Sequence, residues 1–426
     1  MMQFLEILTG AVSAVKPVTG NTGYWLILPT VIIAVWTALV GYRKGRDIFS
    51  PLCFFSGFYL LWMVGGYLIN YSDRSFHLAE HYRTIPFYIL IGYLSFLVGY
   101  LIPVIESKKT ISYKVNYKKY PPIKKNLYVI YFIAFIFSIL YYAMTWRILM
   151  SGLIHQTRFE AISGMGYIYH VMELFYYFFL VYLATKWFFK SAFTVFDWVL
   201  LILALLPLLI HFHRGPIIWI IISLISYRHY ISKKVSIKKL MVLAVVLFCL
   251  GAFLGNLREG NKNMAIFLRA SNEIKVHVWN LSRHMSKSRE IGVPLGIKPV
   301  WMAVALLAPG PDLDFSRWLQ EKFGYPDIPS ITLIGEGYMS YFIWGVILEF
   351  FILGFLLRQV YYLFVKKPGL RNLCIYIFLL TQSCSAITFG INKVLVSTIY
   401  FIGLSIILIP GDTVLPADED QGVSTD

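Results

Sequence analysis

The chain has 426 residues, of which 58% are hydrophobic and only 14% are charged. Soluble domains carry roughly 25% charged residues, so this composition excludes a soluble globular protein and indicates an integral membrane protein. The formal net charge of +16 does not indicate nucleic-acid binding, because the lysines and arginines gather in short segments between apolar runs, as cytoplasmic loops do.

Apolar runs of about the 17–25 residues needed to cross a bilayer as a helix follow one another along the chain. They are continuously apolar, which favours helices over a β-barrel. The predicted spans are residues 24–41, 52–70, 85–105, 127–145, 167–189, 194–212, 216–231, 240–256, 338–358, 372–390 and 393–410. The sequence therefore predicts an all-α polytopic membrane protein with about eleven (10–12) transmembrane helices in a single membrane domain over residues 1–426.

The basic segments alternate with less basic ones, which assigns a side of the membrane to each connection. The longest connection, residues 257–337, is predicted to be a large, partly helical periplasmic loop. A loop of this length is usually functional or disordered, and its aromatic and apolar content favours function. The acidic tail, residues 411–426, is predicted to be cytoplasmic and disordered. An odd number of spans leaves the N-terminus outside, whereas both termini are cytoplasmic if residues 2–16 also cross.

The segment HFHRGP, residues 211–216, is the first candidate site. Gly215 followed by Pro216 is typical of a helix start, whose unpaired N–H groups attract anions. Arg214 adds a guanidinium that binds phosphate at two points, and His211 shares its helix face, with His213 adjacent. The structural alternative is that Arg214 only reaches toward lipid headgroups.

A basic stripe in the outer loop is the second candidate. Its members fall within about 60° of one another on a helical wheel: Arg258, Lys262, Arg269, Arg283 and Lys287. One cationic face would suit a polyanionic lipid headgroup, and the alternative is an ordinary solvated face. His284, on a neighbouring face with His277, is either a general base or a plain surface histidine.

The third candidate is Glu336, which precedes a predicted span on the outer side. A carboxylate in a first helical turn is stabilised by the helix dipole, so a structural role stands beside the role of a general base. Asp312 and Asp314 form a D-x-D pair, but they lie in a Gly/Pro-rich turn and are interpreted as turn-capping residues. The spacing of potential ligands predicts no metal site.

Two segments together resemble a known family. LLPLLIHFHRGPIIWIIISLISYRHYISKK resembles the arginine-glycine helix pair of Wzy-type O-antigen and oligosaccharide repeat unit polymerases. IGEGYMSYFIWGVILEFFILGFLLR is similar to a late motif of that family, with a G-E-x-Y pattern that ends at Tyr338. Ser340 and Glu349 depart from the family's pattern, in which an amide and an apolar residue are expected.

The resemblance implies a metal-independent glycosyltransferase without a cofactor in the bacterial inner membrane. It would move a growing glycan from undecaprenyl pyrophosphate onto an incoming lipid-linked repeat unit, with a flippase and a chain-length regulator as partners. In this interpretation Arg214 and Arg258 hold the pyrophosphate, and Glu336 or a loop histidine accepts the proton. The residues assigned to substrate binding are His211, His213, Lys262, Arg269, Arg283, His284 and Tyr338.

Other functions remain open at the level of sequence. An O-antigen ligase differs only in its acceptor. A transporter or flippase for lipid-linked oligosaccharides would be expected to show internal repeats and broken helices in mid-membrane. A membrane O-acyltransferase needs a reactive histidine inside the bundle, whereas most of the nine histidines lie in loops or near span ends.

Overall fold

A computed structural model describes most of the predicted helices. The described stretches are residues 23–43, 47–71, 82–102, 179–186, 214–231, 234–258, 266–292, 294–305, 315–324 and 331–409, with scattered positions in 129–144 and 194–202. These residues form helices and contain no strand. Three helices among them are long and apolar enough to cross a membrane, namely Pro51–Tyr71, Leu333–Lys366 and Leu370–Ile391. The number of spans, the single domain and the sidedness of the loop stay predictions.

The N-terminal helices follow the predicted spans closely. They are η1 (Gly23–Leu26), α2 (Ile27–Arg43), α3 (Pro51–Tyr59), the π-helical turn η2 (Leu60–Gly65), α4 (Gly66–Tyr71) and α6 (Ile85–Leu101). Helix α3 begins where the Ser50 side chain accepts a hydrogen bond from the Cys53 N–H, and Pro51 occupies the first turn. Helices α3, η2 and α4 run on without a gap, so together they match the predicted span 52–70.

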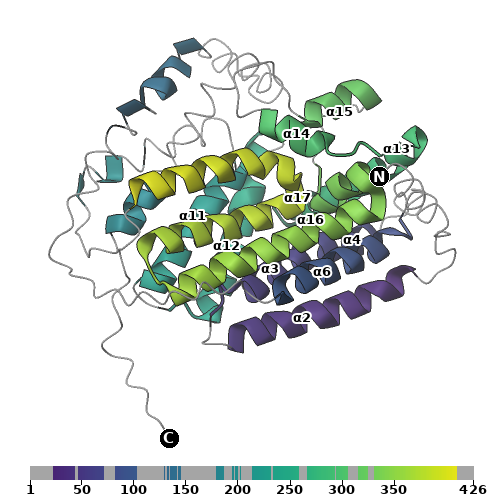
Figure 1. The fold of residues 1–426 in the computed structure, drawn as a ribbon, viewed down its shortest axis with the longest axis horizontal. Helices are drawn as coiled ribbons and strands as arrows, with labels where there is room; N and C mark the ends of the chain where they lie inside the picture. Colours follow the sequence, from purple (N-terminus) through teal and green to yellow (C-terminus); the bar gives the residue numbers. More distant parts are fainter. Residues whose placement is uncertain are drawn as a thin grey trace, which may run out of the picture. The chain divides into compact units, whose positions relative to one another are not determined.

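A buried polar network joins these helices. The hydroxyl of Tyr93 on α6 contacts the hydroxyls of Thr37 on α2 and Ser56 on α3, the latter at 2.6 Å. The Tyr59 hydroxyl donates to the Ile89 carbonyl oxygen at 2.6 Å. In an apolar surrounding an unpaired hydroxyl is costly, so these bonds fix how α2, α3 and α6 pack (Figure 1).

Helix α16 (Leu333–Lys366) contains a sharp break. Tyr341 and Phe342 have non-helical backbone angles, and Phe342 has a φ of 54°. The first arm folds back on the second, and their backbones touch at Gly337 and Gly345. A Cβ at Gly345 would overlap the carbonyl oxygen of Gly337. The predicted span began at residue 338, so the helical arm before it was not anticipated.

Two of the carbonyl groups before the break accept hydrogen bonds from outside the helix. The backbone N–H groups of Leu295 and Gly296 donate to the carbonyl oxygens of Met339 and Ser340, each at 2.9 Å. Beyond the break, α16 lies against α6, where Gly99 and Gly354 allow the backbones to touch. Small residues permit this close approach between membrane helices.

Helix α17 (Leu370–Leu408) is broken at Gly390, which has φ 75° and ψ 169°. This region of backbone space is essentially restricted to glycine. The break coincides with the predicted boundary between spans 372–390 and 393–410, so the sequence located this division correctly.

Two helices of a separate group match the predicted spans 216–231 and 240–256. They are α11 (Arg214–Ile231) and α12 (Ile237–Arg258). In the same group, Tyr376 stacks on Phe364 with ring centroids 5.5 Å apart and meets Tyr230 at 6.1 Å. The described helices thus gather in two compact units. One unit contains α2 to α6, α13 to α15, α16 as far as Arg358, and residues 382–397.

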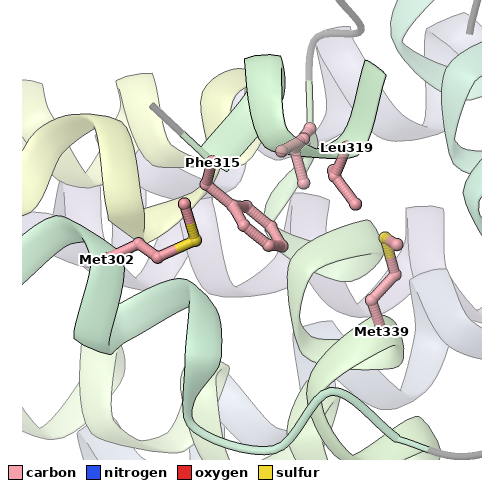
Figure 2. Packing of buried hydrophobic residues seen from close by; sticks show 5 residues of the cluster. Met302, Phe315, Leu319 and Met339 are labelled. Carbon is pink, nitrogen blue, oxygen red and sulfur yellow. The ribbon is translucent and has the colours of Figure 1, made fainter. Parts of the chain in front are cut away.

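The predicted loop 257–337 is folded wherever the structure describes it. It contains α13 (Ile266–Ile291), α14 (Lys298–Ala305), α15 (Phe315–Phe323) and the start of α16. Helices α14 and α15 pack on the first arm of α16 through Met302, Phe315, Leu319 and Met339 (Figure 2). The prediction that this segment is partly helical is therefore confirmed, and residues 411–426 lie outside the described residues.

Candidate functional site

Arg214 and Arg258 lie at the same end of a helix pair. Helices α11 and α12 pack against each other and are joined by residues 232–236, so they run antiparallel. A Cβ at Gly251 would lie 3.3 Å from Ile218 Cδ1, which fixes the register of the pair. From that contact, Arg214 lies about 6 Å and Arg258 about 10 Å along the helix axes in the same direction, at 1.5 Å per residue. The start of α11, which carries Arg214, and the end of α12, which carries Arg258, therefore lie side by side.

Helix α13 presents two different faces. Its buried face includes His277, Leu281 and His284, and it packs along α4. The Asn70 side chain of α4 donates to the Lys275 carbonyl oxygen at 2.8 Å, and Gly66 leaves room for Ile274. Helix α13 is therefore docked on the bundle and is not a free helix of an outer loop.

The other face of α13 lines a cleft of about 190 Å³. The lining residues are Trp279, Ser282, Arg283, Ser286 and Lys287 from α13, with Phe323 and Gly324 from the end of α15. Lys287 Nζ forms an ion pair with Glu290 at 2.6 Å. The predicted substrate-binding residue Arg283 therefore lies in a hollow that has cationic, hydroxyl and aromatic walls.

Glu336 lies in the first turn of α16 and is fully buried. Its backbone N–H donates to the Thr332 carbonyl oxygen at 2.8 Å, and the Thr332 hydroxyl accepts from Gly335 N–H at 3.0 Å. The Glu336 carboxylate faces the backbone of Gly390, where a Cβ would overlap its Oε2 atom. The expectation of a carboxylate at the entrance of a span is therefore replaced by one enclosed within the fold, at the break of α17.

His284 and Glu336 are brought into one neighbourhood. His284 is fully buried, and its Cδ2 atom lies 3.3 Å from the position of a Cβ on Gly335, next to Glu336. The expectation that His284 is a surface histidine is wrong, because this face of α13 packs inward. Tyr338, one turn after Gly335 on α16, is also buried, and its ring meets that of Tyr88 edge-on with the centroids 5.1 Å apart.

His277 has a packing role. Its ring meets Trp62 edge-on at 5.3 Å and Phe389 at 5.8 Å. Such contacts hold an imidazole inside a core. Glu349, on the second arm of α16, is buried, and its Oε2 has no hydrogen-bond partner among the described residues.

The remaining predicted residues are only partly described. His211, His213 and Lys262 lie outside the described residues, and Arg269 is placed on α13 by its backbone. Sequence reasoning missed Trp279 and Phe323. Trp279 lies four residues before Arg283, so helical spacing alone puts both on one face of α13. Phe323 comes from another helix, and only the fold brings it to that face.

A family model for O-antigen polysaccharide polymerase Wzy matches residues 1–272, which is more than half of the chain. The chain belongs to this family. Wzy proteins are integral membrane proteins that act on lipid-linked oligosaccharide repeat units, so this chain has a role in O-antigen polymerisation. Comparisons with curated proteins and with solved structures gave no match.

The Wzy match covers only some of the candidate residues. Arg214, Arg258 and Arg269 lie within residues 1–272, whereas Arg283 and Glu336 lie beyond them. The arginine-glycine segment thus lies in the part that carries the family signal. The late segment with the G-E-x-Y pattern depends on the sequence resemblance and on its place in the structure.

Proposed function

We propose that this Wzy protein joins undecaprenyl-pyrophosphate-linked repeat units at the outer leaflet of the bacterial inner membrane. The growing glycan would be transferred from its diphosphate carrier to the non-reducing end of the incoming unit. The observation that carries the proposal is the place of Arg214 and Arg258 at one end of the α11–α12 pair, within the residues matched by the family.

Charge development explains why arginines suit this reaction. A bond forms between the acceptor hydroxyl oxygen and the anomeric carbon, while the bond from that carbon to the diphosphate oxygen breaks. The leaving diphosphate gains negative charge, and fixed cations stabilise it in the transition state. Guanidinium groups supply this charge, so we propose a metal-independent transfer in which Arg214 and Arg258 hold the diphosphate.

The distribution of basic residues supports an outward-facing site. Arg228 lies in the last turn of α11, and Lys238 and Lys239 lie in the first turn of α12, at the end opposite to Arg214 and Arg258. Basic residues concentrate in cytoplasmic connections. We therefore place the Arg214 end on the periplasmic side, where a flippase would deliver repeat units and a chain-length regulator would meet the polymer.

The acceptor hydroxyl must also lose a proton. We propose Glu336 as the general base, because the packing around Gly335 and Gly390 holds its carboxylate in one place. Since this carboxylate is fully buried, the acceptor hydroxyl has to reach it inside the fold, at the break of α17. A base must be positioned within hydrogen-bond reach of the proton that it takes. Glu321 provides a control: Glu336→Gln is expected to stop polymerisation, whereas Glu321→Gln, at an exposed position on α15, is expected to preserve it.

The arginine assignment is tested by the length distribution of the polymer in cells that depend on this protein. Arg214→Ala and Arg258→Ala are each expected to leave single repeat units while the protein inserts at wild-type levels. Arg228→Ala is the matched control at the opposite end of α11 and is expected to give the normal ladder. A normal ladder from Arg214→Ala would remove that residue from the reaction.

The ladder also separates polymerase from ligase. A polymerase produces a series of bands that differ by one repeat, whereas a ligase makes a single transfer of a finished chain. Loss of the whole series in Arg214→Ala, with capping of preformed polymer unchanged, is the outcome expected for a polymerase.

A further inference from the structure

A second candidate binding site is the cleft between α13 and the end of α15. We propose that it binds one anionic sugar ring, a uronate, of the glycan substrate. This inference rests on the proposed function only in taking a glycan as the substrate. Its evidence is the nature, position and size of the residues that line the hollow.

The wall from α13 is a single helix face. Trp279, Arg283 and Ser286 recur at the spacing of successive turns, and Ser282 and Lys287 lie beside them. The opposite face of α13 is buried against α4 and Gly335. The lining side chains are therefore carried by a helix that is fixed in place, as a specific binding site requires.

The facing wall is an ordered aromatic group. Phe323 meets Trp318 edge-on at 5.7 Å, and Trp318 stacks on Phe315 at 5.8 Å. Lys298 Nζ lies 3.8 Å from the centre of the Trp318 ring. Trp279 and Phe323 thus offer aromatic surface on both sides of the cleft, which suits the apolar C–H face of a pyranose ring.

The polar groups in the cleft match the rest of such a ring. The Ser286 hydroxyl donates to the Ser282 carbonyl oxygen at 3.2 Å, and its oxygen keeps the capacity to accept a bond from a sugar hydroxyl. Arg283 has a planar guanidinium with several N–H donors, a geometry that pairs with a carboxylate at two points. Arg283 is therefore the residue expected to select an acidic sugar, because its fork of donors matches a carboxylate better than the single ammonium of Lys287 does.

Size and openness favour one ring of a longer chain. The cleft volume of about 190 Å³ is below the roughly 300–1,000 Å³ of pockets for drug-sized ligands. At Gly324 a Cβ would meet no atom within 4 Å. Among the described residues nothing closes the cleft at Gly324, so we expect neighbouring sugars of the glycan to continue there.

Binding to the full-length protein in lipid nanodiscs tests the inference. The probes are methyl β-D-glucuronide, methyl β-D-glucoside and inorganic pyrophosphate, titrated by saturation-transfer NMR. We expect the glucuronide to bind about tenfold more tightly than the glucoside, as a charge-assisted hydrogen bond allows. Arg283→Ala should remove this preference, Arg283→Lys should retain part of it, and Trp279→Ala should weaken both sugars.

The control variant is Lys322→Ala, which removes an exposed charge next to Phe323 without changing the lining. It is expected to bind as the wild type does. The inference is overturned if no sugar binds, if the glucuronide binds no better than the glucoside, or if Arg283→Ala keeps the preference. It is also overturned if pyrophosphate binds as tightly as the glucuronide and depends on Arg283, because the cleft would then be a diphosphate site.

The failure of this inference is distinguishable from failure of the proposed function. Arg214→Ala is expected to abolish polymer and to leave glucuronide binding unchanged, because the described lining of the cleft comes from α13 and α15. Normal polymer from Arg214→Ala would contradict only the proposed reaction site. A wild-type protein that does not prefer the glucuronide would contradict only the proposed uronate site in the cleft.

Discussion

Replacing Gly390 with alanine is expected to damage the proposed site in a measurable way. Gly390 has φ 75° and ψ 169°, a region in which other residues cost about 1–3 kcal/mol. The new methyl group would also overlap Oε2 of Glu336 and lie 3.2 Å from the Ile331 carbonyl oxygen. Because Glu336 is fully buried, its carboxylate cannot swing into solvent and must shift within the fold.

The expected loss of activity follows from the size of that shift. A displacement of about 1 Å in a positioned catalytic group lowers a rate by about 100-fold. Gly292→Ala is the matched control, because Gly292 has a φ of 69° and a Cβ there would meet no atom within 4 Å. That variant should carry backbone strain of about 1–2 kcal/mol without disturbing Glu336.

The assay combines thermal unfolding in detergent with the initial rate of polymer formation in membranes. Both variants are expected to lower stability, and only Gly390→Ala is expected to lower the rate per folded molecule by about 100-fold. If the two variants polymerise at the same rate, Glu336 is not a base positioned against Gly390, and the acid–base assignment is refuted.

Three further predictions concern the fold. Gly99→Ala would place a Cβ onto the Phe351 carbonyl and should lower the unfolding free energy by about 1–3 kcal/mol, measured by thermal unfolding. Asp197→Asn removes the buried carboxylate that pairs with Lys186 and should cost about 3 kcal/mol in the same measurement. Trp301 is 65% exposed on α14, and its fluorescence should be quenched by brominated lipid if this helix lies in the membrane interface.

Each of these three predictions has its own control. Gly57→Ala, where a Cβ meets no atom within 4 Å, should not destabilise, and an equal loss would refute the close contact of α6 and α16. Adding Lys186→Met to Asp197→Asn should recover part of the stability, because no unpaired buried charge remains. Trp301 should be quenched more than Trp318, which lies under Lys298, and equal quenching would contradict the expectation that α14 lies in the membrane interface.

Hydropathy located the helices well, because a helix exposed to lipid must be apolar along its whole length. Predicted spans 52–70 and 85–105 correspond to Pro51–Tyr71 and Ile85–Leu101. The break at Gly390 was also located, since a glycine followed by polar residues interrupts the apolar run. The predicted spans 127–145, 167–189 and 194–212 lie mostly outside the described residues.

The break at Tyr341 and Phe342 could not be read from hydropathy. Both residues are apolar and aromatic, so the run appears continuous. The reversal depends on Gly337 touching Gly345 and on hydrogen bonds from Leu295. Those partners come from separate positions in the chain, and only the folded protein brings them together.

In the candidate site, too, the features set by local sequence were predicted, whereas those set by packing between helices were not. The basic stripe correctly placed Arg283 and Lys287 on one face of a helix, because residues at i and i+4 share a face. It was wrong for Arg258, which ends the separate helix α12, so the predicted stripe does not lie on a single helix. It gave no hint of Phe323, which reaches the cleft only through the packing of α15. Burial of His284 and Glu336 was missed for the same reason, since α13 was expected to face solvent.

The most direct test of the central claim uses the purified protein in liposomes with a defined undecaprenyl-pyrophosphate-linked repeat unit and a metal chelator. We expect the wild-type protein to form a ladder of dimers and longer chains with release of undecaprenyl pyrophosphate, and Arg214→Ala to form no ladder. Unextended repeat units from the wild-type protein, or a ladder that forms only after a divalent metal is restored, would contradict it.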